Sequence, residues 1–248
     1  MVIAVIGGSG GLGEAVVRRV AVRAPVVIGY RSNQAKAEAM VEEIRHAGGQ
    51  ASAVQVDITS SDSVAAFFDT ALRVAGPITH IVSATGPAIP LVPLLEVDEA
   101  DFRRILETDV LGTFNVLRRG VPVLQRAGGG SITVFATTAV LRTLENDSMS
   151  SVPKTAVCGL VKLAARESGP HNVRCNAVAP GVIDAGIVHS AFTLTDVARK
   201  VIADCLERTP MPRMGRPEEV AALVDFLCSE SAAYINGQVI GIDGGYSA

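Results

Sequence analysis

Residues 2–13 read V-I-A-V-I-G-G-S-G-G-L-G, a short apolar run that passes directly into a cluster of glycines. The apolar run predicts a buried strand, and the pattern over residues 12–23 predicts a helix. A second apolar run follows at residues 25–29. Strand, helix and strand in this order predict a βαβ unit, in which a crossover helix joins two parallel strands.

The same alternation continues to the end of the chain. Further strands are predicted at 51–56, 78–82, 131–135, 173–178 and 238–242, and further helices at 33–47, 61–74, 98–125, 151–167 and from 217. Parallel strands need crossovers that cover both faces of the sheet, so we predict an α/β fold with a doubly wound parallel sheet of seven strands. Residues 1–248 contain no linker or repeat and are expected to form one domain, with its functional site beyond the carboxyl ends of the strands.

The composition argues against several classes of protein. The 22 Lys and Arg against 25 Asp and Glu give a formal charge of −3, so no nucleic-acid surface is predicted. The apolar runs are far shorter than the ~18 residues of a membrane span, and the N-terminus has no basic leader, so a cytoplasmic protein is expected. The four cysteines occur singly, without a C-x-x-C pair, and are expected to be buried thiols that form neither a disulfide framework nor a metal site.

The glycine cluster predicts a site for a pyrophosphate. Its residues are Gly7, Ser9, Gly10, Gly11, Leu12 and Gly13. Without Cβ atoms the backbone can approach the phosphates, and the helix that follows offers unpaired N–H groups and the positive end of its dipole. In the first strand-to-helix turn of a βαβ unit, this pattern is typical of a dinucleotide cofactor.

Arg31 indicates which dinucleotide is bound. Sites that prefer NAD carry Asp or Glu at the end of the second strand, whereas this chain has Arg31 and Ser32 there. An arginine would form charge-assisted hydrogen bonds with a 2′-phosphate, so NADP(H) is the predicted cofactor, unless Arg31 is an ordinary surface charge. Asp57, which closes the third strand, either accepts a hydrogen bond from the adenine amino group or simply begins a turn.

With these features the chain resembles the short-chain dehydrogenase/reductase family, and within it the ketoacyl reductases. Besides the glycine turn, the segments that carry the resemblance are 30–33, 56–58, 176–181, 215–220 and 237–245. The resemblance implies a Rossmann-type sheet of order 3-2-1-4-5-6-7 and a homotetramer built from the fourth and fifth helices and the last strand. It also implies cofactor contacts from Gly7, Gly11, Gly13, Arg31, Ser32, Asp57, Ile58, Ala84 and the loop with Pro180, Gly181 and Ile183.

Members of this family use Asn, Ser, Tyr and Lys together. The tyrosine gives a proton to the carbonyl oxygen as hydride arrives from the nicotinamide, while the lysine holds the ribose and lowers the tyrosine pKa. The resemblance puts Asp109, Thr137, Ser150 and Lys154 at these four positions, so only the lysine is unchanged. Ser150 is a far weaker acid, because an aliphatic alcohol has a pKa roughly 5 units above that of a phenol. Pro153 is expected in the first turn of its helix, where no N–H is needed.

The proton must then come from water or from another acid. The candidates are Asp109, Glu145, Asp147 and His189, although the plainer interpretation is a solvated loop at 145–147 and a surface histidine at 189. Tyr30, Tyr234 and Tyr246 are too distant in sequence to replace the missing tyrosine by a register shift. In the enoyl reductases of this family the tyrosine sits seven residues before the lysine, a position that Asp147 occupies here.

Three functions remain open at this point. The first is an NADP(H)-dependent oxidoreductase that acts on a carbonyl, a hydroxyl or an activated double bond, with an atypical active site. The second is a non-redox enzyme such as a cyclase, dehydratase or isomerase, and the third is a catalytically silent, cofactor-binding subunit of a hetero-oligomer. Residues 86–97 and 184–209 are expected to cover a small-molecule substrate whose identity they do not reveal.

Overall fold

The computed structural model describes residues 1–87, 89–186 and 196–248. Within these ranges the chain forms, in order, β1 (Val2–Ile6), α1 (Gly11–Val20), β2 (Val26–Tyr30), α2 (Gln34–His46), β3 (Ala51–Gln55), α3 (Ser61–Ala75), β4 (Ile78–Ser83), α4 (Glu99–Leu106), α5 (Gly112–Arg126), β5 (Gly130–Phe135), α6 (Ser148–Ser168), β6 (Val173–Pro180), α8 (Asp196–Glu207), α9 (Pro217–Leu227) and β7 (Val239–Ile242). Short 3₁₀ turns lie at 94–96, 138–140, 169–171 and 230–232.

The strands form one sheet of order β3-β2-β1-β4-β5-β6-β7, in which all neighbours are parallel. This confirms the predicted fold class, strand order and strand positions, with ends that move by one or two residues. Because every strand runs the same way, the segments that follow the strands all emerge at one edge of the sheet.

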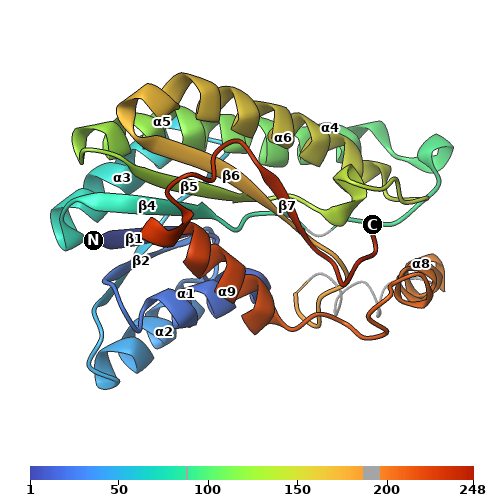
Figure 1. Ribbon diagram of the computed structural model, residues 1–248, viewed down its shortest axis with the longest axis horizontal. Helices are drawn as coiled ribbons and strands as arrows, with labels where there is room; N and C mark the ends of the chain where they lie inside the picture. The colour runs from blue at the N-terminus through green and yellow to red at the C-terminus, as the bar shows by residue number, and fades with distance from the viewer. Residues whose placement is uncertain (88, 187–195) are drawn as a thin grey trace.

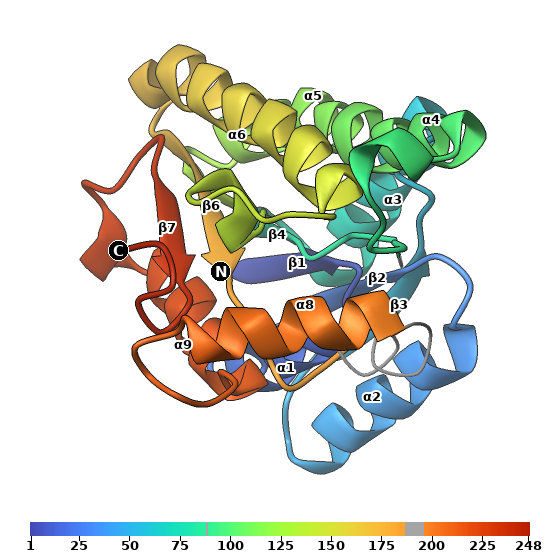
Figure 2. The same cartoon turned by 90° about the vertical axis from the view of Figure 1, so that its right-hand side faces the viewer.

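Helices cover both faces of the sheet (Figure 1). Helices α3, α5 and α6 lie on one face and α1, α2 and α9 on the other, while α8 lies beyond the edge at which the strands end. Figure 2 looks onto that edge, with α8 across its front. The alternation of β1 explains the two layers, because Val2, Ala4 and Ile6 join the core under α3, α5 and α6, whereas Ile3 and Val5 join the core under α1, α2 and α9.

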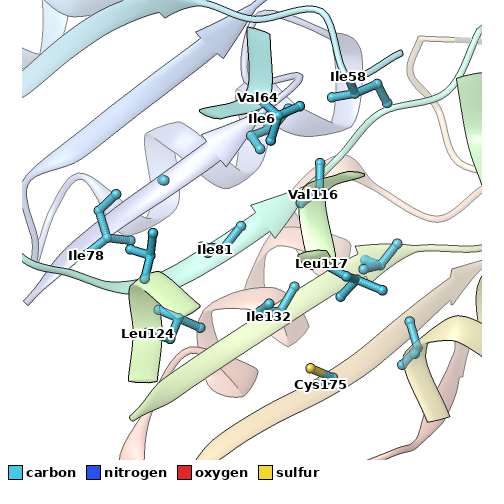
Figure 3. Packing of buried hydrophobic residues seen from close by; sticks show 14 of the residues in the cluster. Ile6, Ile58, Val64, Ile78, Ile81, Val116, Leu117, Leu124, Ile132 and Cys175 are labelled. Atoms are coloured by element: carbon cyan, nitrogen blue, oxygen red, sulfur yellow. The ribbon is translucent and has the colours of Figure 1, made fainter. Parts of the chain in front are cut away.

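The packing of one of these cores is seen in Figure 3. Ile6, Ile81 and Ile132, from three adjacent strands, share this core with Val64 of α3, which lies beside Ile6, and with Val116 and Leu124 of α5. A strand that is buried on both faces needs a continuous apolar run, which is the pattern of residues 2–6. The core thereby holds the ends of the strands, and the turns that follow them, in fixed positions.

The prediction of one continuous helix over residues 98–125 is wrong, because the helix is interrupted in its middle. A π-helical segment, Glu107–Leu111, separates α4 from α5 and contains the buried Asp109. Such bulges insert one residue into a helix and redirect a side chain. Here the redirected side chain is the carboxylate of Asp109, which faces α6.

The helix predicted to start near Ser151 begins earlier, at Ser148, with Asp147 as its N-cap residue. Pro153 therefore lies inside α6 and not in its first turn, so the expectation for this proline is wrong. The earlier start occurs because the backbone carbonyl of Asp147 already accepts hydrogen bonds from the amides of Ser150, at 3.1 Å, and Ser151, at 2.8 Å.

Candidate active site

A cavity of 310 Å³ lies at the edge where the strands end. Its wall combines the glycine turn after β1, residues 84–86 after β4, the end of β5, the start of α6, the loop after β6, α8 and the C-terminal segment. Among the residues predicted to bind a cofactor, it includes Gly10, Gly11, Leu12, Ala84, Lys154, Pro180, Gly181 and Ile183. Segments that are far apart in sequence therefore meet at one site, as the doubly wound topology predicts.

The glycine turn leaves no room for side chains. Gly7 has a φ of +80°, and a Cβ at Gly13 would lie 2.1 Å from the carbonyl oxygen of Gly7. Gly10 is the N-cap residue of α1 and provides no side chain to cap its first-turn amides. Gly11 and Leu12 of this first turn line the cavity, and no side chain occupies the hydrogen-bonding positions of the first-turn amides. The turn therefore fits a dinucleotide pyrophosphate.

The residues predicted around the adenosine half of the cofactor lie outside this cavity. Arg31 and Ser32 are exposed beyond the end of β2, and the guanidinium of Arg31 forms no ion pair or hydrogen bond within the described residues. Asp57 begins a turn, because its Oδ1 accepts hydrogen bonds from the amide of Thr59 at 3.0 Å and from its hydroxyl at 2.8 Å. The Ile58 side chain is buried in the core, so only its backbone is available to a ligand.

Lys154 and Asp109 form a buried pair. Lys154 Nζ lies 3.2 Å from Asp109 Oδ1 and donates a hydrogen bond to the carbonyl oxygen of Thr85 at 3.3 Å. The orientation of the two charged groups does not meet hydrogen-bond geometry, so their contact is electrostatic. Burial raises the pKa of Asp109, while Lys154 acts in the opposite direction.

The two predicted hydroxyl groups also line the cavity. Ser150 lies one turn before Lys154 on α6, and its hydroxyl has no protein partner within the described residues. Thr137 lies at the end of β5, where its Oγ1 accepts a hydrogen bond from the Ala139 amide at 3.3 Å. The cavity thus brings Thr137, Ser150 and Lys154 together, with Asp109 behind the lysine.

Asp147 lies in the same wall and does not belong to a solvated loop. Its side chain is 4% exposed, and burial raises its pKa to about 7. The Val92 amide donates a hydrogen bond to the Asn146 carbonyl at 3.0 Å, so the loop after β4 covers this segment. Glu145 is exposed as expected, and His189 lies outside the described residues.

Two further side chains in this wall, Tyr246 and Cys205, were not among the predicted catalytic groups. Tyr246 is 3% exposed and packs with Cys205 of α8, while the Arg142 guanidinium donates a hydrogen bond to the Tyr246 carbonyl at 2.7 Å and lies 5.1 Å from the centre of its ring. Burial raises the pKa of both the phenol and the thiol. A comparison of sequence spacings could not find Tyr246, but its position four residues after the last strand places it at the functional edge.

Much of the cavity lining is apolar. Its large aliphatic side chains are Ile89, Leu91, Leu144, Val182, Val201 and Ile202. The variable region thus supplies hydrophobic contacts through α8, as a small-molecule pocket requires. Across the described ranges there is no cluster of metal-ligating side chains, and all four cysteines are free and buried.

No helix among the described residues combines the length and apolar character needed to cross a membrane.

Comparison with known proteins gives consistent matches over the whole chain. The family model described as Enoyl-(Acyl carrier protein) reductase matches residues 7–247. The cis-4-hydroxycyclohexanecarboxylate dehydrogenase of Sinomonas cyclohexanicum is 36% identical over 248 residues, which cover 100% of this chain and 96% of that protein.

Two solved structures show the same similarity in three dimensions. A short-chain type dehydrogenase/reductase from Mycobacterium ulcerans has a TM-score of 0.91 at 32% identity, over 99% of this chain and 89% of that chain. A 7α-hydroxysteroid dehydrogenase complexed with NADH and 7-oxo glycochenodeoxycholic acid has a TM-score of 0.89 at 31% identity, over 98% of this chain and 93% of that chain.

Proposed function

The chain belongs to the short-chain dehydrogenase/reductase family of oxidoreductases, and from this premise we propose that it interconverts an alicyclic secondary alcohol and its ketone with NADP(H). The observation that carries the proposal is that the glycine turn, Lys154 and an apolar chamber share one cavity. An activated double bond is the alternative substrate, and the description of the matching family model favours it.

The cofactor half of the proposal is supported by the groups available to hold it. The first-turn amides of α1 would hold the pyrophosphate, and Lys154 would donate hydrogen bonds to the ribose hydroxyls. Bound there, a nicotinamide dinucleotide would supply or accept a hydride. Lys154 would keep its position through the Thr85 carbonyl and Asp109, which together restrain its ammonium group.

Arg31 supports NADP(H) over NAD(H). Its guanidinium is exposed and unpaired within the described residues, so it is free to form charge-assisted hydrogen bonds with a 2′-phosphate. The segment 30–33 has no carboxylate that would accept from ribose hydroxyls or repel a phosphate. The related hydroxysteroid dehydrogenase was solved with NADH, so this preference needs a direct test.

The shape and polarity of the cavity support a hydrophobic ring as substrate. The lining combines aliphatic side chains with a few groups that form hydrogen bonds, among them Thr137, Ser150 and Lys154. An alicyclic ring would pack against the aliphatic side chains and turn its oxygen toward these polar groups. Two of the related proteins act, by their names, on a hydroxylated cyclohexane and on a steroid hydroxyl.

The active site is non-standard in this proposal, because Ser150 stands where the family pattern has tyrosine. A serine hydroxyl can donate a hydrogen bond to the substrate oxygen but is too weak an acid to transfer a full proton. Thr137 keeps the second hydroxyl of the pattern. The site can therefore orient a carbonyl, and the proton needs another source.

We also propose a homotetramer. Leu111, Phe114 and Leu163 are 44%, 41% and 55% exposed on the outer face formed by the π-helical segment, α5 and α6. Such a set of exposed apolar side chains is typical of an interface. Light scattering should give four times the chain mass, and Phe114→Glu should lower it, whereas a monomeric wild-type protein would contradict this proposal.

The cofactor proposal is tested by calorimetry with NADPH and NADH. Arg31→Ala should weaken NADPH binding by about 10- to 100-fold, the equivalent of about 1.5–3 kcal/mol for hydrogen bonds to a charged group, and leave NADH binding unchanged. Equal loss for both cofactors, or none for NADPH, would refute the role of Arg31.

The reaction is tested by following NADPH absorbance with cyclohexanone, and the reverse reaction with cis-4-hydroxycyclohexanecarboxylate and NADP⁺. Tight NADPH binding without turnover of these compounds or of an enoyl substrate would refute the oxidoreductase proposal. It would favour the cofactor-binding subunit instead.

A further inference from the structure

We propose that the Asp147 carboxyl, which lines the cavity together with Ser150 and Lys154, is the group that exchanges a proton with the substrate oxygen. The inference deepens the proposed function and rests on it, since it names the acid that the reduction requires. The glycine turn and Lys154 would bind the cofactor, whereas Asp147 would donate the proton to the substrate oxygen.

The geometry of α6 brings the three groups to one side of the helix. Asp147 caps α6, Ser150 follows three residues later and Lys154 four residues after that, and these spacings place successive side chains on one face. All three line the cavity. We therefore infer that the Asp147 carboxyl faces the space in which Ser150 would hold the substrate oxygen.

The carboxyl has no partner that would explain its burial. The Asp147 backbone carbonyl accepts hydrogen bonds from two first-turn amides and from the Ser151 hydroxyl, but its side chain caps no amide. Within the described residues it forms no ion pair and no hydrogen bond. An N-cap aspartate normally accepts from an amide of the first turn, so this one is available to a ligand in the cavity.

The surroundings leave this carboxyl easy to protonate. Burial raises its pKa to about 7. The titratable groups around it are Cys205 of α8, Tyr246 of the C-terminal segment and Lys154 of its own helix, and the lysine is already paired with Asp109. Both the acid and the carboxylate are therefore available near neutral pH, which is the condition for general acid–base catalysis.

The step balances with two co-reactants: a nicotinamide cofactor, which would supply the hydride and be oxidised or accept it and be reduced, and water, which exchanges the proton with Asp147. In reduction, the hydride forms a C–H bond at the carbonyl carbon, the C=O π bond breaks and its electron pair moves to the oxygen. The oxygen takes the proton of the Asp147 carboxyl, and the resulting carboxylate regains a proton from water. In alcohol oxidation, the Asp147 carboxylate would accept the hydroxyl proton and pass it to water, while the hydride would go to the oxidised nicotinamide cofactor.

Tyr246 is the competing acid in the same wall. Burial raises the pKa of its phenol, and the side chain packs with Cys205 of α8. It also lies on a separate segment, whereas Asp147 shares the helical face of Ser150 and Lys154. The Tyr246→Phe variant is therefore part of the test.

The first measurement needs neither cofactor nor turnover. Infrared difference spectra of the cofactor-free protein between about pH 5.5 and about pH 8.5 should show the carbonyl band of a protonated carboxylic acid that disappears as the pH rises through about 7. Asp147→Asn should remove this band, and the exposed neighbour variant Glu145→Gln should keep it. A spectrum in which Asp147→Asn removes no such band overturns the inference.

The second measurement is the pH profile of kcat/KM for cyclohexanone reduction. Wild-type activity should fall above about pH 7, whereas Asp147→Asn should be about 10²- to 10⁴-fold slower and lose that pH dependence. Asp147→Glu should restore part of the rate, and NADPH affinity should be unchanged in all variants, which shows that they are folded. Tyr246→Phe should retain the wild-type profile.

The outcomes separate the two proposals. Absence of turnover in the wild-type protein overturns the proposed function and this inference with it. Turnover that survives in Asp147→Asn with the same pH profile overturns the inference alone, as does a profile that is lost only in Tyr246→Phe.

Discussion

The burial of Asp147 has a measurable consequence for the stability of the fold. In the native protein burial holds the carboxyl protonated up to a pKa of about 7, from an ordinary value of 3.8 that the unfolded chain would show. Between these two values the folded state binds a proton that the unfolded state does not. The free energy of unfolding must therefore fall as the pH rises through this window.

The magnitude follows from the difference in pKa. About 3 units at about 1.36 kcal/mol per unit correspond to about 4 kcal/mol over the whole window, of which about 3 kcal/mol falls between about pH 5 and about pH 8. Asparagine at position 147 does not titrate. We therefore expect the stability of the wild-type protein to drop by about 3 kcal/mol relative to Asp147→Asn over this range.

The pH dependence of stability has to be compared between wild type and Asp147→Asn, because His80 makes stability rise with pH whereas Asp147 makes it fall. Burial, with the charges of Arg174 and Arg23, lowers the pKa of His80 to about 4. The unfolded state then binds the additional proton between about pH 4 and about pH 6.5, so this histidine makes stability rise with pH in that range. Subtracting the Asp147→Asn curve from the wild-type curve removes this contribution.

The assay is urea unfolding of the cofactor-free protein at both pH values and at one protomer concentration, because oligomers unfold in a concentration-dependent way. Glu145→Gln is the matched control, since this neighbouring carboxylate is exposed and should leave the pH dependence unchanged. Parallel curves for wild type and Asp147→Asn would refute the claim that Asp147 is protonated in the folded protein.

Two further predictions concern the glycine turn and the buried ion pair. Gly13→Ala would place a Cβ 2.1 Å from the Gly7 carbonyl oxygen, so NADPH affinity measured by calorimetry should fall by at least about tenfold, or about 1.4 kcal/mol. Gly159→Ala is its control, because a Cβ there meets nothing within 4 Å, and stability should rise by about 1 kcal/mol. Lys154→Met should lower the free energy of urea unfolding by about 3–5 kcal/mol, because it leaves Asp109 buried without its counter-charge. Adding Asp109→Asn should restore most of that loss, and a fully stable single variant would contradict the importance of the pair.

The fold was predictable because its signals are local. The apolar run at 2–6 is long enough for one buried strand, and the glycines that follow permit a turn that other residues cannot form. Each later strand repeats the same pattern between helices, so the parallel topology follows from connection rules alone. The ends of the helices were less predictable. The spacing of apolar residues around 107–111 does not indicate the π-helical segment that separates α4 from α5.

The state of the active-site acids was not predictable, because it depends on contacts between distant segments. Asp147 forms a backbone bridge with Val92 of the loop after β4, and it lines one cavity with Cys205 of α8 and Tyr246 near the C-terminus. The sequence alone offers three polar residues at 145–147, a composition typical of an exposed loop. Only the folded chain distinguishes the exposed Glu145 from its buried neighbour.

The two unusual acids of this site are connected through Lys154. Asp109 Oδ1 lies 3.2 Å from Lys154 Nζ, so the charge of the ammonium group is balanced before it reaches the rest of the cavity. Asp147 stands seven residues earlier, about 10 Å along the helix. At an effective dielectric constant of about 20, an unbalanced ammonium at that distance would stabilise the carboxylate by about 1.7 kcal/mol and lower its pKa by about one unit. Burial is the cause that raises the pKa of Asp147 to about 7. In the proposed mechanism, an Asp109 carboxylate that balances Lys154 would leave Asp147 able to give a proton to the ketone substrate and to take one from the alcohol, which a serine hydroxyl cannot do.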